Sequence, residues 1–506
     1  MEKEYSMPSE LISELRERLG QVADLNATIA LLQWDQEVCM PPKGAQARGR
    51  QLATVSAMAH RMFTDERVGA LLNELRSGSV VSPDDRVLVE ESLRDYERAT
   101  KLPEVFVERF AEEQSRAYEA WTRSREQDDF AIFRPHLETM FDLLRQKTDY
   151  FGYAGSPYNA LLDEYERGMT VEQLNPIFAD LAKRQSALVS RIALSDTQAD
   201  GVWMKGEWDA NAQWGLTLGI LGDMGYDFEA GRQDKSVHPF STSFDLYDVR
   251  VTTRVNPNEL FSALTGSMHE GGHALYEQGF REEDRRTPLA QGTSMGMHES
   301  QSRMWENMIG RSLPFWERYA PAYQGQFPGR LDNVSTEQMF RAINRVEPSF
   351  IRVEADECTY NLHIILRYEL ETALIEGRMK VSEVPEAWNA KMKQYLGVDV
   401  PSDAVGCLQD IHWSHGLVGY FPTYALGNLY AAQLFEAMSA SLPDIWGQVE
   451  AGNFGGILGW LRTHVHVHGR RKTAPEIVRT STGSEPSSEP YMRYLTEKYS
   501  SLYGLS

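Results

Sequence analysis

The chain has few cysteines and no excess of basic residues. Its three cysteines among 506 residues are too few and too scattered for a disulfide framework or a cysteine-based zinc site. We therefore expect Cys39, Cys358 and Cys407 to be small buried residues in a protein of the reducing cytoplasm. The formal charge is −22 at pH 7. Because nucleic acids and anionic membranes bind clustered Lys and Arg, this charge argues against both as partners.

Long apolar runs are also absent. The longest apolar stretches, such as residues 215–221, are short and interrupted by glycine, whereas a membrane-spanning helix needs roughly 20 residues. Residues 1–20 lack the basic start, apolar core and cleavage site of a secretory signal. The sequence thus predicts a cytoplasmic protein. With 42% apolar residues, the chain can still bury a large core.

Helical periodicity dominates what is present. Apolar residues recur on one helical face from Leu11 to Leu25, and this first helix should end at the prolines 41 and 42. Further helices are predicted after Ser82, after the capping boxes at 170–173 and 335–338, and around Tyr494 and Tyr499. No repeat and no linker divides the sequence. We therefore predict one mostly α-helical domain over residues 1–506.

One segment breaks the helical pattern. Residues 241–255 are rich in Phe, Tyr, Val and Thr, which predicts a β-strand. With a period of two, Asp248, Arg250 and Thr252 would form a polar face opposite Tyr247, Val249 and Val251. Such a strand could bind an extended peptide by edge pairing. A solvated hairpin is the alternative.

A five-residue string, HEGGH at 269–273, carries the strongest chemical signal. Residues four apart on a helix share a face, so His269 and His273 can converge on one ion. A catalytic zinc needs about three protein ligands and an open position, and Glu299 on a second helical segment would complete the set. Glu270 is then free to act as general base on a metal-bound water, whose pKa the ion lowers towards about 7. The string predicts metal-dependent hydrolysis.

The alternative is an ordinary amphipathic helix with two exposed histidines, because this pattern also arises by chance. The context argues against it. The string NPNE at 256–259 is typical of a helix start, and a helix from there to Gly279 would place the motif in its middle. At such a position Gly271 and Gly272 each cost about 1 kcal/mol relative to alanine. We expect that another chain segment approaches closely there.

Recognition of the chain end would separate a carboxypeptidase from other peptidases. A guanidinium binds a carboxylate through two parallel hydrogen bonds, so an arginine beside the metal would select a C-terminal carboxylate. Arg250 and Arg352 are the candidates. Each could instead be a structural partner of a nearby acid, Asp248 or Asp356, which is the commoner fate of an arginine beside an aspartate.

Six strings in order carry a family resemblance. They are HPF at 238–240, DVRVT at 248–252, HEGGH at 269–273, HES at 298–300, IRVEAD at 351–356 and GCLQDIHW at 406–413. Together they resemble the motif set of the carboxypeptidase Taq family of metallopeptidases. They span residues 238–413, about a third of the chain, and the N-terminal half carries no such motif.

The resemblance implies a metal-dependent carboxypeptidase that releases C-terminal amino acids from short peptides with broad specificity. It implies a mostly helical fold with a deep cleft and a small β-sheet beside the metal, similar to neurolysin and angiotensin-converting enzyme, and a homodimer. One divalent ion per subunit is expected, zinc first and cobalt as the alternative. The family positions fall on His269, His273 and Glu299 as metal ligands, Glu270 as catalytic carboxylate, and Arg250 and Arg352 as carboxylate anchors. Of the two arginines we rank Arg352 slightly ahead.

Hydrogen-bond donors near the metal could stabilise the oxyanion of the transition state. The candidates for this and for substrate binding are His238, His412, Tyr420 and Tyr424. The last three lie in a His- and Tyr-rich stretch that resembles the segment lining the cleft of neurolysin-type enzymes. A packed aromatic helix with a satisfied histidine is the alternative. Asp248, Asp356 and Asp410 are expected to orient ligand or arginine side chains.

A second histidine cluster occurs near the C-terminus, where His464, His466 and His468 alternate. In an extended segment they would share a face, as in a metal site. Because no carboxylate follows at a useful spacing, we expect a solvated surface instead.

The leading hypothesis is a cytoplasmic metallocarboxypeptidase acting on peptides with a free C-terminal carboxylate. An endo-acting oligopeptidase and a zinc-stabilised binding protein without catalysis are the alternatives.

Overall fold

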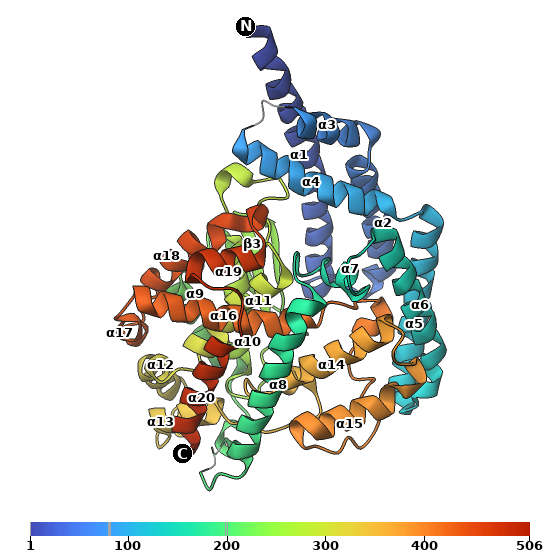
Figure 1. Cartoon of the computed structure of the whole chain (residues 1–506). Coiled ribbons are helices and arrows are strands. Elements are labelled where there is room, and N and C mark those ends of the chain that lie inside the picture. The colour runs from blue at the N-terminus through green and yellow to red at the C-terminus, as the bar shows by residue number, and fades with distance from the viewer. Residues whose placement is uncertain (1, 79–81, 198, 200, 506) are drawn as a thin grey trace.

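Helices build most of the molecule (Figure 1). The computed structural model describes residues 2–78, 82–197, 199 and 201–505. Its helices are α1 (Glu2–Val38), α2 (Ala45–Phe63), α3 (Glu66–Ser77), α4 (Pro83–Lys101), α5 (Glu104–Gln127), α6 (Phe130–Phe151), α7 (Tyr158–Leu162), α8 (Val171–Ala193), α9 (Ala210–Met224), α10 (Ser262–Glu277), α11 (Met295–Arg303), α12 (Leu313–Gln326), α13 (Thr336–Ile343), α14 (Tyr360–Ile375), α15 (Val384–Leu396), α16 (Pro422–Ser441), α17 (Ile445–Glu450), α18 (Gly455–His464), α19 (Ala474–Thr482) and α20 (Glu489–Tyr503). Among these described helices, none combines the length and the apolarity needed to cross a bilayer.

Several helix starts follow the local sequence as predicted. The Ser82 hydroxyl accepts a hydrogen bond from the backbone N–H of Asp85 and begins α4. Reciprocal capping boxes begin α8 at Thr170 and α13 at Ser335. The first helix ends before the prolines, and Leu15 and Leu19 of its apolar face are buried. The prediction of a mostly helical fold is therefore confirmed.

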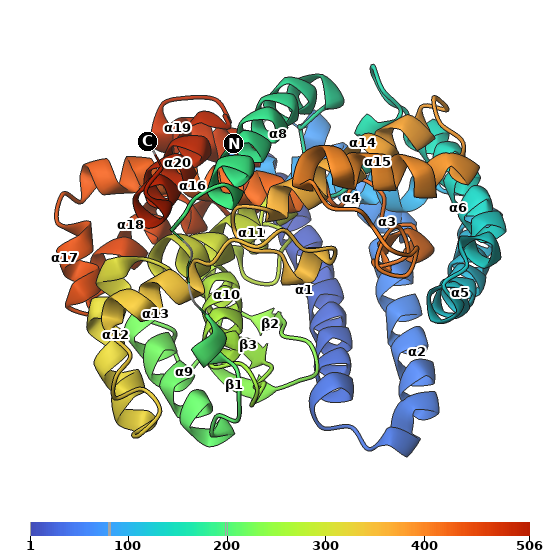
Figure 2. The same ribbon diagram turned by 90° about the horizontal axis from the view of Figure 1, so that it is seen from below.

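Within the described residues, three strands form one sheet in the order β1–β3–β2. The segment predicted to be strand forms β2 (Ser241–Asp245) and β3 (Asp248–Thr253), which pair antiparallel. The strand β1 (Gly231–Lys235), which pairs parallel with β3, was not predicted because its sequence GRQDK lacks β-branched and aromatic residues. Figure 2 shows the sheet between α1 on one side and α9 on the other, with α10 packed against it.

One expectation about this sheet is wrong, and another stays a prediction. Thr252 is buried rather than part of an exposed polar face, because its hydroxyl hydrogen-bonds the backbone of Phe240. The central strand is β3 and both of its edges are paired, so it cannot accept a further strand. Edge pairing of a peptide with β2, which comes from the same predicted segment, stays a prediction. Among the described strands, β1 and β2 each have an outer edge, and β2 contacts α1.

The core divides into two parts among the described residues. The larger cluster joins the helices from α5 onwards to the sheet, and the smaller one joins α1, α3 and α4 with Leu289. Cys358 and Cys407 are buried as expected, whereas Cys39 is exposed because it follows the end of α1. The prediction for Cys39 was therefore wrong.

Close packing of three helices places the HEGGH string. Helix α10 contacts α9, α11 and β3, and α11 packs along α16. A β-carbon added at Gly272 would lie 2.7 Å from the carbonyl oxygen of Gln301, and one at Gly271 would clash with the Leu221 side chain of α9. The expected close approach of other segments is thus confirmed, and it explains why glycine stands at both positions.

The helix start predicted at residues 256–259 is wrong. Helix α10 begins only at Ser262. The Asn256 side-chain oxygen accepts a hydrogen bond from the backbone N–H of Asn258, which makes a local turn instead of a helix cap. The backbone of Glu259 then bridges to Lys205. The motif nevertheless lies mid-helix, about two turns after the start.

Candidate metal centre

The side chains of His269, His273 and Glu299 converge at one point. One ligand atom from each lies within 4.8 Å of the others. The Nε2 atoms of His269 and His273 lie 3.7 and 3.6 Å from the same carboxylate oxygen of Glu299. The two imidazoles come from successive turns of α10, and the carboxylate comes from α11. Two nitrogens and one oxygen, largely shielded from solvent, suit a divalent ion such as zinc.

A second set of side chains fixes both imidazole rings. His269 Nδ1 lies 2.9 Å from a carboxylate oxygen of Glu306. His273 Nδ1 lies 2.6 Å from His298 Nδ1, and His298 Nε2 lies 2.7 Å from Glu277. Because the Nδ1 atoms are engaged, the Nε2 atoms are left facing the common centre. Partners of this kind orient metal ligands and raise their basicity.

Sequence reasoning missed this second set. Glu306 lies in a π-helical turn, Met304–Ile309, which continues α11. Such turns shift the register of a helix and recur at functional sites, but no residue pattern predicts one. His298 and Glu277 could have been found, because the first precedes Glu299 directly and the second lies four residues after His273 on the same helical face.

Arginine and glycine neighbours position Glu299. The Nε atom of Arg303, one turn further along, donates to Glu299 at 2.7 Å, and a second nitrogen of Arg303 lies 3.2 Å from Glu306. Burial opposes the charge of Glu299, but Arg303 and the two imidazoles hold its pKa well below the usual range. On the other side Gly427 of α16 packs against the Glu299 side chain, which leaves no room for a β-carbon.

Glu270 lies beside the ligands with its side chain largely shielded. Its exposed fraction is 7%, and burial raises the pKa of its carboxyl to about 7. Burial also lowers the pKa of His273 to about 3, so that imidazole is neutral and able to bind a metal at physiological pH. Carboxylates Glu299 and Glu306 outweigh burial at His269 and raise its pKa. A carboxylate held beside the three ligands can serve as a general base.

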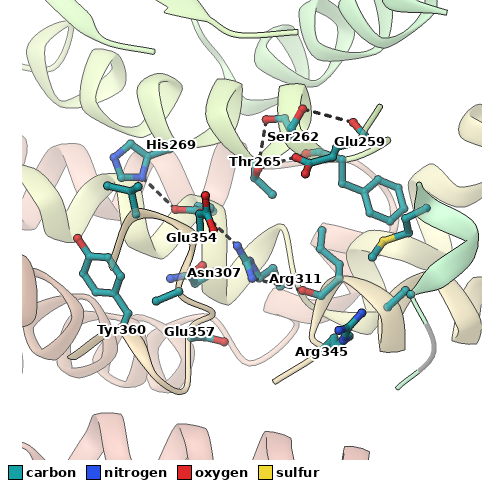
Figure 3. Close-up of a pocket in the computed structure, with 18 of the residues that line it drawn as sticks. Glu259, Ser262, Thr265, His269, Asn307, Arg311, Arg345, Glu354, Glu357 and Tyr360 are labelled. Atoms are coloured by element: carbon teal, nitrogen blue, oxygen red, sulfur yellow. Dashed lines mark hydrogen bonds and ion pairs between the residues drawn. The ribbon is translucent and has the colours of Figure 1, made fainter. Parts of the chain in front are cut away.

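A cavity of about 700 Å³ adjoins the centre. One wall is the face of α10 that carries Ser262, Thr265 and His269, and the other includes residues 352–355 and Glu357. Figure 3 shows His269 and Tyr360 at one end of this cavity and Arg345 at the other. The remaining lining mixes charged, polar and apolar residues, among which Tyr360, Arg303, Arg311, Asn307 and Asn428 were not predicted.

The two candidate arginines differ in their surroundings. Arg250 makes two hydrogen bonds of 2.8 Å to Asp248 and stacks on Trp34 and Phe244, and it is not among the described residues that line the cavity. Of the two interpretations of Arg250, the structural ion pair with Asp248 therefore describes its contacts. Arg352 lines the cavity and is 5% exposed.

Arg352 is held by Asp410 and Tyr360, not by Asp356. Two of its nitrogens lie 3.1 and 2.9 Å from one oxygen of Asp410, and a third lies 3.0 Å from the Tyr360 hydroxyl. Asp356 instead accepts backbone N–H bonds from Glu347, Cys358 and Thr359. The expectation that Asp356 orients a ligand or arginine was therefore wrong, because its carboxylate caps a turn. Asp248 and Asp410 do orient arginines.

The His- and Tyr-rich segment lies against this arginine. The ring of Tyr424 lies 5.0 Å from the Arg352 guanidinium and lines the cavity. His412, Tyr420 and Tyr424 pack against one another, with ring centroids 5.3 to 6.4 Å apart. Burial lowers the pKa of His412 to about 4. His238 is exposed and is not among the described residues that line the cavity, whereas the following residue, Pro239, is one of them.

The C-terminal histidine cluster is not a solvated surface, so that expectation was wrong. His466 is fully buried and lies 3.0 Å from the Gln301 side chain, which ties the segment after α18 to α11. Its burial follows from the helical turn at residues 466–471, which breaks the extended alternation. Within the described residues, a group able to hold an ion occurs at His269, His273 and Glu299 and not here.

Comparisons with known proteins agree on one family. The family model described as carboxypeptidase Taq (M32) metallopeptidase matches residues 14–499. Thermostable carboxypeptidase 1 of Thermus thermophilus is 40% identical over 509 residues, covering 98% of this chain and all of the relative. Carboxypeptidase 1 of Bacillus subtilis is 39% identical over 491 residues, covering 97% of this chain and 98% of the relative.

Solved structures are equally similar. The M32 carboxypeptidase of Deinococcus radiodurans superposes with a TM-score of 0.96 at 39% identity, covering 98% of this chain and 100% of that one. A Pyrococcus furiosus carboxypeptidase structure gives a TM-score of 0.94 at 34% identity, covering 97% and 99%.

Proposed function

Because the chain belongs to the carboxypeptidase Taq family of metallopeptidases, we propose that it removes amino acids one at a time from the C-termini of short peptides. It is a metallocarboxypeptidase, a peptide hydrolase that depends on a divalent metal ion. The observation that carries the proposal is the convergence of His269, His273 and Glu299 beside the cavity. Broad specificity is proposed because the cavity is large and its walls are chemically mixed.

The proposed ligands are His269, His273 and Glu299, and the proposed ion is zinc, with cobalt as the alternative. Both ions accept two imidazole nitrogens and a carboxylate oxygen. A divalent ion held there would act as a Lewis acid and lower the pKa of a water molecule. Glu306 and His298 hold the two rings so that their Nε2 atoms would be free to bind the ion.

Glu270 is proposed as the general base. It takes a proton from the attacking water and then delivers that proton to the amine of the departing residue. Its position next to His269 and its shielding from bulk solvent support this role. The raised pKa follows from burial, and a dication nearby would bring it back down, so the carboxylate is ionised when the attack begins.

Arg352 is proposed as the anchor for the terminal carboxylate of the peptide. A guanidinium has five N–H donors, and three of them are engaged by Asp410 and Tyr360, so two remain. Arg250 keeps a weaker claim, because it is not among the described residues that line the cavity, whereas Arg352 is. A carboxylate bound at Arg352 would align the last peptide bond with the metal and leave an internal peptide without this contact.

Tyr420, Tyr424 and His412 are proposed to donate hydrogen bonds to the substrate and to the oxyanion. Burial holds the pKa of Tyr424 well above its usual range, so its hydroxyl keeps a proton to donate. His412 is neutral and can donate through one ring nitrogen. His238 is proposed to act at the rim of the cavity, since Pro239 lines it.

The remaining features are proposed for the chain as a whole. Residues 1–506 would form one metallocarboxypeptidase domain, since the family model spans nearly the full length. A homodimer is proposed on the family resemblance. A cytoplasmic location is proposed because the described cysteines are unpaired, as is usual in a reducing compartment.

Product analysis separates this function from an endo-acting oligopeptidase. One unblocked peptide and its C-terminally amidated twin would be incubated with zinc-loaded protein, with and without a chelator, and the products identified by mass spectrometry. We expect stepwise loss of single residues from the unblocked peptide only, and only with metal. Cleavage of the amidated twin at the same rate would contradict C-terminal recognition.

Replacing Glu270 separates the enzyme from a zinc-stabilised binding protein. Glu270→Gln removes the proposed base while keeping the size of the side chain and all three ligands. We expect one zinc per chain, measured by atomic absorption, and turnover reduced at least about a hundredfold. Normal turnover by this variant would refute the role of Glu270, and loss of zinc would show that Glu270 is needed for binding.

A further inference from the structure

Behind the cavity, two buried arginines share one aspartate. Asp410 directs its Oδ1 oxygen to Arg352, at 2.9 and 3.1 Å. Its Oδ2 oxygen lies 2.7 and 2.6 Å from two nitrogens of Arg367, which projects from α14. Arg367 is 0% exposed, and it also donates a hydrogen bond to the carbonyl oxygen of His363. The ring of Phe421 lies against both guanidinium groups.

The charges of this cluster do not cancel. Two guanidinium groups and one carboxylate leave a net charge of +1. The neighbouring imidazoles add none, because burial lowers the pKa of His412 to about 4 and that of His363 well below its usual range. Glu371, one turn further along the same helix, accepts its hydrogen bonds from the neutral donors Tyr158, Trp413 and Gly419 and not from Arg367. Burial raises its pKa to about 7, although the charge of Arg367 acts in the opposite direction. An unbalanced charge away from water is costly unless an anion is supplied.

We infer that Arg367 is a positioning residue for C-terminal recognition. It compensates Asp410 from the side opposite the cavity, so the positive charge of Arg352 remains available on the cavity side. The anion that completes the cluster is then the terminal carboxylate of the peptide. This inference rests on the proposed role of Arg352 and adds the reason why an arginine already paired with an aspartate can still bind a carboxylate.

Removing Arg367 alone should therefore weaken substrate binding without touching the metal. In Arg367→Met, Asp410 would neutralise Arg352, and both of its oxygens would compete with the substrate carboxylate for the same donors. In the double variant Arg367→Met with Asp410→Asn, the net charge returns to +1. A role limited to packing predicts the opposite order, because the double variant has lost more polar contacts than the single one.

The test is steady-state kinetics on an unblocked peptide, with zinc content measured for each variant. We expect Arg367→Met to raise KM about 10- to 100-fold, the range of a hydrogen bond to a charged group, with kcat nearly unchanged. The double variant should recover most of that loss. Arg367→Lys, which keeps the charge, should stay within a few-fold of the natural protein and serves as the matched control.

Three results would overturn the inference. The first is an unchanged KM in Arg367→Met. The second is a fall of kcat as large as the rise of KM, in both the single and the double variant. The third is a double variant that binds the peptide more weakly than the single variant. If Arg367→Met does not fold, the double variant alone decides, because it should keep a near-normal KM. Failure of the proposed function would look different: the natural protein itself would then cleave amidated and unblocked peptides equally.

Discussion

Replacing Glu166 with glutamine should make the stability of the protein less dependent on pH. Glu166 is 0% exposed and stands behind the start of α11, the helix that carries Glu299. One of its oxygens accepts hydrogen bonds from the hydroxyls of Ser294 and Tyr430, at 3.0 and 2.9 Å. The other accepts the backbone N–H of Gly296 at 3.0 Å. These are neutral donors, and burial raises the pKa of Glu166 to about 7.

The size of the effect follows from linkage. The pKa of Glu166 rises from 4.5 to about 7 on folding, so the folded state binds the proton more tightly. The resulting stabilisation is complete below pH 4.5 and is lost as the pH rises to 7. At about 1.4 kcal/mol per pKa unit, about 3 kcal/mol is lost across this range. Glutamine has no charge to bury, so this loss should disappear.

Glutamine can also keep the hydrogen bonds of Glu166. Its oxygen can accept from the Gly296 N–H, and its amide nitrogen can donate to the oxygens of Ser294 and Tyr430, because both hydroxyls rotate. The free energy of unfolding would be measured by urea denaturation from pH 5 to pH 8, for both proteins with saturating zinc. The contribution of zinc binding to stability is the same in both proteins, so it cancels in the difference between their free energies of unfolding. Between pH 5 and pH 8, the free energy of unfolding of Glu166→Gln should rise by about 2 to 3 kcal/mol relative to that of the natural protein. A difference that does not change with pH would refute the reasoning.

Three further substitutions probe the surroundings of the site. Glu371→Gln should also make stability less dependent on pH, but its free energy of unfolding at pH 5 should fall by about 1 to 3 kcal/mol. Two of the groups that donate to Glu371 are N–H groups, which cannot accept a hydrogen bond from an amide nitrogen. Urea denaturation, with Glu166→Gln as the control, checks this. Glu306→Gln should weaken zinc binding about 10- to 100-fold through the loosened ring of His269, measured by chelator competition, and unchanged affinity would contradict it. Gly272→Ala should destabilise the protein by about 1 to 3 kcal/mol, since its β-carbon would meet the backbone of α11; normal stability would show that the two helices can separate freely.

Short-range patterns predicted the centre of the site well. The i, i+4 spacing of His269 and His273 was enough to predict that both rings face one point, because helix geometry fixes it. The two glycines of the string indicated a close approach, which the backbone of α11 and the side chain of Leu221 provide. Helix starts were predicted where a side chain caps its own backbone, as at Ser82.

Interactions between distant segments were not predictable. Arg352 pairs with Asp410, 58 residues away, rather than with Asp356 four residues along the chain. Nothing in the local sequence distinguishes these aspartates, since the choice depends on how α14 and the following loops pack. The start of α10 was misplaced for a related reason: Asn256 suits a turn as well as a helix cap, and the bridge to Lys205 favours the turn.

The central claim is that two imidazoles and one carboxylate hold a single divalent ion next to Glu270. Anomalous X-ray scattering at the zinc edge, from crystals of zinc-loaded Glu270→Gln protein, tests it most directly. We predict one strong peak about 2.0 to 2.2 Å from His269 Nε2, His273 Nε2 and a Glu299 oxygen. A peak elsewhere in the chain, or no peak at these three side chains, would contradict the account.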